Sequence, residues 1–251
     1  MTVPEAAAIF AAGVGAGTIN TVVGSGTLVT FPVLLAFGYA PVTANVSNTV
    51  GLVPGSATGA IGYRAELAGQ RRRSVTLGLF SLLGAVTGAI LLLVLPASAF
   101  KRIVPVFIAL ALVLIVAQPR LSRFIAARRT RTPHHGGAGA MAGVFASGVY
   151  GGYFGAAQGI LLLAVLGLAL DDDLHRTNAL KNVLAGVVNG VAALVFVVSA
   201  HVAWGPAALI AAGSILGGLI GARYGRRLPP AALRAVIVAV GIFAILRLLL
   251  D

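Results

Sequence analysis

Residues 13–38 read GVGAGTINTVVGSGTLVTFPVLLAFG, an apolar stretch without a charged side chain that is interrupted by Gly24, Ser25 and Gly26. The uncharged run around it extends from Glu5 to Arg64. Comparable runs follow along the chain, over 75–95, 103–119, 136–170, 182–222 and 235–246. Backbone in the hydrocarbon core of a bilayer must satisfy its own hydrogen bonds, so these runs predict membrane-embedded helices.

The composition agrees with this class. Of 251 residues, 59% are hydrophobic and only 10% are charged, whereas a soluble domain carries roughly 25% charged residues. We therefore expect an all-α polytopic membrane protein surrounded by the lipid bilayer. The net charge of +12 does not indicate a nucleic-acid partner, because Lys and Arg lie in short loops beside predicted spans, where membrane topology accounts for them.

Nothing in the sequence indicates catalysis. The chain contains no cysteine, which excludes thiol chemistry and cysteine-based metal sites. No Ser, His and Asp spacing suggests a nucleophile triad, and there is no phosphate-binding loop. We expect no enzyme activity, no cofactor and no metal site, and the oligomeric state is left open.

An internal repeat relates the two halves of the chain. Shifting the numbering by 133 residues superimposes landmarks without a gap: Gly26 on Gly159, Asn45 on Asn178, Gly84 and Gly88 on Gly217 and Gly221, and Leu95-Pro96 on Leu228-Pro229. So many coincidences at one spacing indicate duplication. The predicted parts are a first transmembrane repeat at 1–118, a basic cytosolic linker at 119–137 and a second transmembrane repeat at 138–251.

Each half begins with an interrupted segment, 13–38 or 143–170, followed by three plain spans. The spans are expected at about 43–63, 74–95 and 100–118, and at about 176–199, 204–226 and 231–250. An interrupted segment of about 30 residues is too long for one straight span and too short for two. Glycine allows a backbone reversal, so we expect two half-helices that form a re-entrant pair. One long, kinked span with glycines for close packing is the alternative.

The loop charges favour the re-entrant form. With the N-terminus outside, re-entrant segments place nearly all loop arginines on one side, from Arg64 and residues 71–73 through the linker to Arg176 and Arg223. Full crossings split the arginines between both sides, against the positive-inside rule. Three crossings per repeat invert the second copy, an arrangement that recurs among transporters. We expect a multi-pass protein of the plasma (inner) membrane, with both termini outside and the linker in the cytosol.

Several stretches carry a family resemblance. They are GTINTVVGSGTLVTFP at 17–32, ANVSNT at 44–49, GAIGYR at 59–64, YGGYFG at 150–155 and NALKN at 178–182. Together they resemble the sulfite exporter TauE/SafE family, also called TSUP, in order and over essentially the whole chain. The resemblance implies transport of small anions such as sulfite, sulfonates or sulfoacetate-like compounds. Substrate and direction vary within the family.

Polar side chains form a stripe on the helix after each interrupted segment. Asn178, Lys181, Asn182 and Asn189 share one helical face at offsets 0, 3, 4 and 11. The equivalent residues of the first half are Asn45, Asn48, Thr49 and Ser56. Polar groups at membrane depth face the bundle interior or a cavity. Lys181 is the cation placed inside a span, either as a counter-charge for an anion or as a snorkelling lysine.

The predicted substrate-binding residues combine the two stripes with the two breaks. Half-helices that begin at the breaks would add backbone N–H donors and partial positive charge. The candidates are Asn20, Ser25, Gly26, Thr27, Asn45, Asn48, Thr49, Gln158, Gly159, Asn178, Lys181 and Asn182. No Asp or Glu lies deep in a predicted span, so we expect export of an anion driven by the membrane potential. An anion channel and a Na⁺- or H⁺-coupled uptake carrier are the alternatives.

Overall fold

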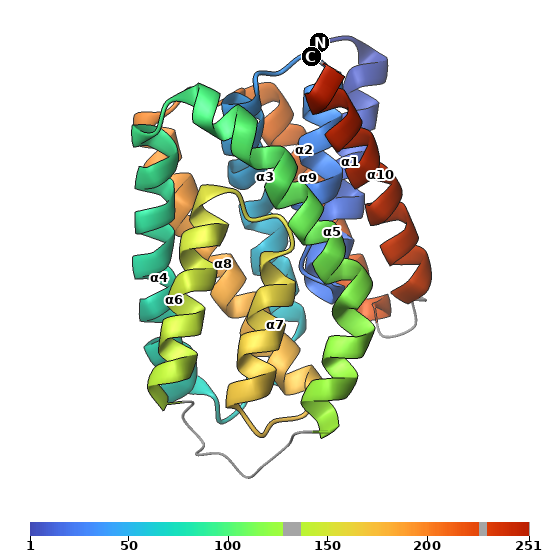
Figure 1. Cartoon of the computed structure of the whole chain (residues 1–251). Coiled ribbons are helices and arrows are strands. Elements are labelled where there is room, and N and C mark those ends of the chain that lie inside the picture. Colours follow the sequence, from blue (N-terminus) through green and yellow to red (C-terminus); the bar gives the residue numbers. More distant parts are fainter. Residues whose placement is uncertain (128–136, 226–229, 251) are drawn as a thin grey trace.

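The computed structural model describes residues 1–127, 137–225 and 230–250, and all regular secondary structure in these ranges is α-helical. In the first half the helices are α1 (Val3–Val22), α2 (Thr27–Ala36), α3 (Pro41–Gly62), α4 (Arg71–Val94) and α5 (Ala97–Ala127). In the second half they are α6 (Gly137–Tyr153), α7 (Gln158–Ala169), α8 (Leu174–Ser199), α9 (Trp204–Tyr224) and α10 (Pro230–Leu250). The predicted all-helical fold is confirmed (Figure 1).

Within the described residues, four helices are long and apolar enough to cross a membrane by length and composition. They are α4, α8, α9 and residues 97–121 of α5. The helix α5 continues to Ala127, past the predicted end of its span at residue 118. The predicted boundary marked the end of the apolar run, and the helix itself extends beyond it. Residues 128–136 of the predicted linker lie outside the described residues.

Both interrupted segments are broken helices, as predicted. The break between α1 and α2 covers four residues and contains Gly24 at φ 91°, a left-handed conformation that glycine adopts without strain. The break between α6 and α7 contains Gly155 at φ 79° and Ala157 at φ 59°. In Figure 1, α2 turns back toward the end of the molecule where α1 begins, and α7 turns back likewise relative to α6.

A contact between two distant loops supports re-entrant segments over full crossings. The Gln70 side-chain amide donates to the carbonyl of Arg176 (3.2 Å), and the Arg176 guanidinium donates to the carbonyl of Ala68 (3.2 Å). Arg73 and Asp172 form an ion pair between the same regions. If both interrupted segments crossed the membrane, an odd number of crossings would separate the α3–α4 loop from the start of α8, and these contacts would be impossible.

The helix contacts of the two halves correspond under the 133-residue shift. Contact of α1 with α9 corresponds to contact of α6 with α4, contact of α3 with α9 to contact of α8 with α4, and contact of α2 with α10 to contact of α7 with α5. Glycines let the first pairs approach closely. A Cβ on Gly17 would overlap the carbonyl of Ser214, and one on Gly84 would overlap the carbonyl of Phe145. The inverted orientation of the halves in a bilayer stays a prediction.

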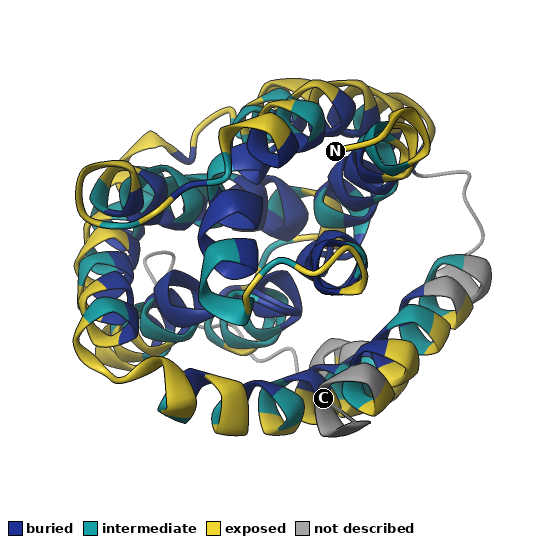
Figure 2. Ribbon diagram, turned by 90° about the horizontal axis from the view of Figure 1, so that it is seen from above, coloured by how far each residue is buried: buried dark blue, intermediate teal, exposed yellow. Residues whose placement is uncertain are grey.

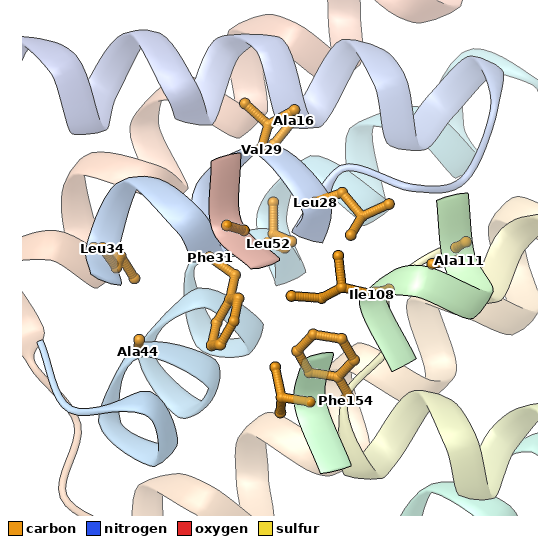
Figure 3. Packing of buried hydrophobic residues seen from close by; sticks show 14 of the residues in the cluster. Ala16, Leu28, Val29, Phe31, Leu34, Ala44, Leu52, Ile108, Ala111 and Phe154 are labelled. Carbon is orange, nitrogen blue, oxygen red and sulfur yellow. The ribbon is translucent and has the colours of Figure 1, made fainter. Parts of the chain in front are cut away.

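The helix α2 lies at the centre of the main hydrophobic cluster. Its Leu28, Phe31 and Leu34 are fully buried, and Phe31 packs edge-on against Phe154 at a ring distance of 5.2 Å (Figure 3). In Figure 2 the buried residues gather on the central helices and on the inward faces of the outer ones. Exposed apolar side chains cover the outward faces, among them Leu79, Val113, Leu194 and Leu219. An apolar exterior of this kind suits contact with lipid.

The start of α8 carries a helix cap. Asp173 accepts hydrogen bonds from the backbone N–H groups of His175 (2.8 Å) and Arg176 (2.9 Å), and Asp172 pairs with Arg176 (3.3 Å). The hydrogen bond from the Arg176 backbone, above all, lowers the pKa of Asp173 below its ordinary value of 3.8, against the opposing effect of burial. Stabilisation by this carboxylate is therefore complete above the ordinary pKa and is lost as the pH falls through the lowered one.

Replacing Asp173 should separate the cap from its charge. Asp173→Ala removes the acceptor and should cost about 1 kcal/mol of stability at pH 7. Asp173→Asn keeps an acceptor oxygen and should lose less stability at pH 7 than Asp173→Ala. Because asparagine does not titrate, the stability of this variant should also fall less than that of the wild type between about pH 5 and about pH 2. Thermal unfolding in detergent across this pH range measures both effects. Parallel pH profiles of wild type and Asp173→Asn would contradict the assignment.

Candidate functional site

The two breaks meet at the centre of the molecule. The backbone N–H of Gly159, in the first turn of α7, donates to the carbonyl of Gly24 in the other break (3.0 Å). A Cβ on either residue would overlap the Cα of the other. Glycine at both positions therefore allows two backbones, far apart in the sequence, to touch where the half-helices begin.

A small cavity of about 20 Å³, part of it open to the outside, lies at this meeting point. It is lined by residues of both breaks and of the facing helices α3 and α8: Asn20, Thr21, Gly24, Thr27, Ser56, Gly59, Gly155, Gln158, Gly159, Asn182, Ala185 and Asn189. Five of the predicted site residues are among them, namely Asn20, Thr27, Gln158, Gly159 and Asn182. The other predicted residues do not line the cavity.

The stripe on α8 points at the C-terminal end of α1. The ammonium of Lys181, which is fully buried, donates to the carbonyls of Asn20 (2.9 Å) and Thr21 (3.4 Å). The side-chain amides of Asn178 (3.2 Å) and Asn182 (3.4 Å) also donate to the Thr21 carbonyl. The last carbonyls of a helix lack intrahelical partners and carry partial negative charge. The Lys181 amino group is thus held at a helix C-terminus and does not snorkel to the surface.

The position of Lys181 relates it to the cavity. A Cβ on Gly159 would lie 3.0 Å from Cδ of Lys181, so the lysine stem runs directly behind that part of the wall. Asn20 and Thr21, whose carbonyls hold the ammonium, line the cavity themselves. The charge of Lys181 therefore lies one residue layer away from the empty space.

Of the polar stripe on α3, Asn45 contacts the second half of the chain, whereas Asn48 and Thr49 bond within the first half. The Asn45 amide donates to the carbonyl of Tyr153 at the end of α6 (2.9 Å). The equivalent residue of the second half, Asn178, likewise donates to a carbonyl at the end of α1. Asn48 differs from its counterpart Lys181, because it contacts α2 instead: its amide donates to the Thr27 hydroxyl (3.3 Å), and the Thr30 hydroxyl donates to its carbonyl oxygen. Thr49 donates within its own helix to the carbonyl of Asn45 (2.9 Å).

Some of the backbone donors expected at the breaks already have acceptors within the protein. The N–H of Gly26 donates to the side-chain oxygen of Asn20 (2.6 Å), and the N–H of Gly159 donates to Gly24. These two amides are therefore not free for a ligand, contrary to expectation. The unpartnered buried side-chain donors nearby are the hydroxyl of Ser25 and the side-chain amide nitrogen of Gln158. Of these two residues, Gln158 lines the cavity.

Some lining residues carried no signal in the sequence. Thr21, Gly59 and Ala185 belong to the wall only because helices from both halves converge there. The pairing of Asn189 with Ser56 (3.0 Å) could have been found, since these residues are equivalent in the repeat and equivalent residues meet at a pseudo-twofold axis. The glycine-rich breaks already pointed to Gly24 and Gly155.

No described acidic side chain lies in a helix interior near the cavity, whereas Lys181 does. The acidic residues that the structure describes are Glu5, Glu66 and residues 171–173, and all of them lie at helix ends or in loops. The described residues include no group of three His, Cys, Asp or Glu that could hold a metal ion. Lys181 is therefore a buried basic side chain without a carboxylate partner among the described residues of the helix interiors.

A broken-helix bundle with a polar cavity at the meeting point of its breaks and an apolar exterior is typical of a membrane transporter. The family model described as "Sulfite exporter TauE/SafE" matches residues 9–248. The chain belongs to this family and is a multi-pass membrane transporter, which agrees with the expectation that it is not an enzyme.

Known relatives are also transporters by name. The chain is 24% identical to the probable membrane transporter protein YfcA of Escherichia coli (strain K12) over 237 residues, which cover 94% of this chain and 86% of the relative. It is 28% identical to the probable membrane transporter protein ORF9 of Sinorhizobium sp over 245 residues, covering 97% and 92%. No solved structure matches the chain.

Proposed function

We propose that this transporter moves small organic or sulfur-containing anions, such as sulfite, sulfonates or sulfoacetate-like compounds, and exports them. The anion binds in the cavity where the two breaks meet, between the two repeats. The observation that carries the proposal is the buried ammonium of Lys181 behind the wall of a neutral polar cavity. An anion in the cavity would compensate this charge.

The cavity wall offers suitable donors for an anion. The Gln158 side-chain nitrogen is buried and has no partner in the protein. The amides of Asn20, Asn182 and Asn189 each have a second N–H beside any bond they already make, and amides donate well to sulfonyl and carboxylate oxygens. The other residues of the proposed substrate-binding set are not among those that line the cavity in this structure: Ser25, Gly26, Asn45, Asn48, Thr49 and Asn178. Thr27 and Gly159 lie in the wall itself.

The membrane orientation completes the proposal. The repeats at 1–118 and 138–251 are inverted, the basic ends of α3, α5, α8 and α9 face the cytosol with the linker, and both termini lie outside the plasma (inner) membrane. This arrangement obeys the positive-inside rule. It also lets the two repeats rock against each other around a fixed central site, as in other inverted-repeat carriers.

Flux into and out of proteoliposomes tests the function. An anion that leaves an inside-negative compartment gains roughly 2.3 kcal/mol per charge at 100 mV, so an imposed potential of that size should change the initial rate several-fold. Purified protein should mediate saturable flux of sulfite or a sulfonate that follows the sign of the potential. Voltage-independent flux would contradict uncoupled export, non-saturating flux would indicate a channel, and strict dependence on a Na⁺ or H⁺ gradient would indicate coupled uptake.

A further inference from the structure

A network of charged and polar side chains joins the two halves of the chain at one end of the molecule. Asp172, just before α8, pairs with Arg73 of α4 and with Arg176 of α8 (3.3 Å). Gln70, at the end of the α3–α4 loop, accepts a hydrogen bond from Arg73 (3.3 Å) and donates one to the carbonyl of Arg176 (3.2 Å). The network therefore fastens the first repeat to the second.

The members of this network are shielded from water. The side chains of Arg73 and Asp172 are only 12% and 17% exposed, and Gln70 is buried. Ion pairs at exposed positions contribute little to stability because water and salt screen them, whereas partly buried, hydrogen-bonded pairs are screened much less. We therefore expect these contacts to hold this end of the molecule closed.

The equivalent place in the other orientation of the repeat is uncharged. Under the 133-residue shift, the three charged residues of the network correspond to Pro206, Tyr39 and Thr43. A contact between the repeats at that place is the hydrogen bond from the backbone N–H of Ala203 to the hydroxyl of Ser47 (2.9 Å). In Figure 1 the loops before α3 and α9 lie at the end opposite to the loops before α4 and α8. The two ends of the molecule are therefore closed by different chemistry.

The network lies between the cavity and its own end of the molecule. Gly59 of α3 lines the cavity, and α3 ends three residues later at Gly62, where the loop that carries Gln70 begins. On α8, Asn182 lines the cavity and Arg176 lies six residues earlier, which is about 9 Å along the helix axis. A solute that moves from this end to the cavity along α3 and α8 must pass the network.

We propose that Asp172, held between Arg73 and Arg176, is a gate that closes the cytosolic side of the cavity and must open before an anion enters. The inference rests on the proposed function, because a carrier of this design exposes one site to each side in turn as its repeats move against each other. Contacts that join the repeats at one end must break when that end opens. Opening also takes Asp172 away from two guanidinium groups, whose positive charge then attracts an anion to the entrance.

Thiol labelling tests the gate, because the chain contains no cysteine and a single introduced one gives the whole signal. Ala185→Cys places a thiol on the cavity wall. A membrane-impermeant maleimide is added to inside-out vesicles, which expose the cytosolic side, and to right-side-out vesicles. In this background, Asp172→Asn should raise the labelling rate from the cytosolic side about tenfold, because charge-assisted hydrogen bonds are lost. Labelling from the outer side should fall, since a carrier open to one side is closed to the other.

Two further variants complete the test. Asp171→Asn removes the same charge from the neighbouring residue, which takes part in neither ion pair, and should leave both labelling rates unchanged. Arg73→Gln breaks the network from the other repeat and should act like Asp172→Asn, so it decides the question even if Asp172→Asn fails to fold. Unchanged cytosolic labelling in a folded gate variant, or a rise from both sides, overturns the proposal. The labelling needs no anion, so absence of sulfite and sulfonate flux would reject the proposed substrates and not the gate.

Discussion

Gly24→Ala should nearly eliminate folded protein. Residue 24 has φ 91°, a conformation that costs an L-residue about 1 kcal/mol or more, and its new Cβ would overlap the Cα of Gly159. That contact joins the two breaks, so relief requires moving α7 away from α1 and opening the hydrogen bond from Gly159 to Gly24. We expect a combined loss of about 3 kcal/mol or more. Size-exclusion profiles and thermal unfolding in detergent measure the effect.

Gly38→Ala is the matched control. Gly38 also has a positive φ, 81°, but a Cβ there meets nothing within 4 Å. This variant carries the backbone strain without the steric overlap and should cost only about 1 kcal/mol. Equal losses for both variants would mean that the breaks do not depend on close contact. An unaffected Gly24→Ala protein would mean that the two breaks do not meet.

The breaks themselves were predictable from the sequence, because a lone glycine cluster inside a long apolar run has few structural outcomes. The helical faces were predictable as well: Asn178, Lys181 and Asn182 share one face and converge on one place. Their target was not predictable. The carbonyls of Asn20 and Thr21 lie about 160 residues earlier in the chain, and helical periodicity carries no information on contacts between distant helices.

Two of the backbone amides expected to be free at the breaks, those of Gly26 and Gly159, have acceptors for a related reason. A sequence indicates where a helix begins, and hence where N–H groups lack helical partners. Whether another part of the chain supplies an acceptor for these N–H groups depends on tertiary packing. Here the side-chain oxygen of Asn20 accepts the hydrogen bond from the Gly26 N–H, and the carbonyl of Gly24 in the opposite break accepts that from the Gly159 N–H. The binding roles of the candidate residues stay predictions, and Gln158 has an unpartnered side-chain nitrogen at the cavity.

Lys181→Met should abolish anion binding. Methionine keeps much of the stem that packs behind Gly159 but removes the charge that an anion in the cavity would face. Loss of one partner of a buried charge pair costs about 3 kcal/mol or more, which corresponds to a roughly 100-fold weaker Kd. The fold should survive, because Asn178 and Asn182 still donate to the Thr21 carbonyl.

Two further variants separate charge from other effects. Lys181→Gln keeps a donor for the carbonyls of α1 and should bind the anion as poorly as Lys181→Met, because the charge is what matters. Lys101→Met makes the same substitution at an exposed lysine of α5 and should leave binding unchanged. If Lys181→Gln binds normally, the ammonium acts through its hydrogen bonds to α1, and the electrostatic account fails.

The most direct measurement is calorimetric titration of sulfite and of a simple sulfonate into the purified wild-type protein and the Lys181→Met variant in lipid nanodiscs, with Na⁺ present throughout. We predict saturable binding of at least one of these anions to the wild type and binding at least about 100-fold weaker to the folded variant. Equal affinity of the two proteins would contradict an anion site governed by the buried charge of Lys181.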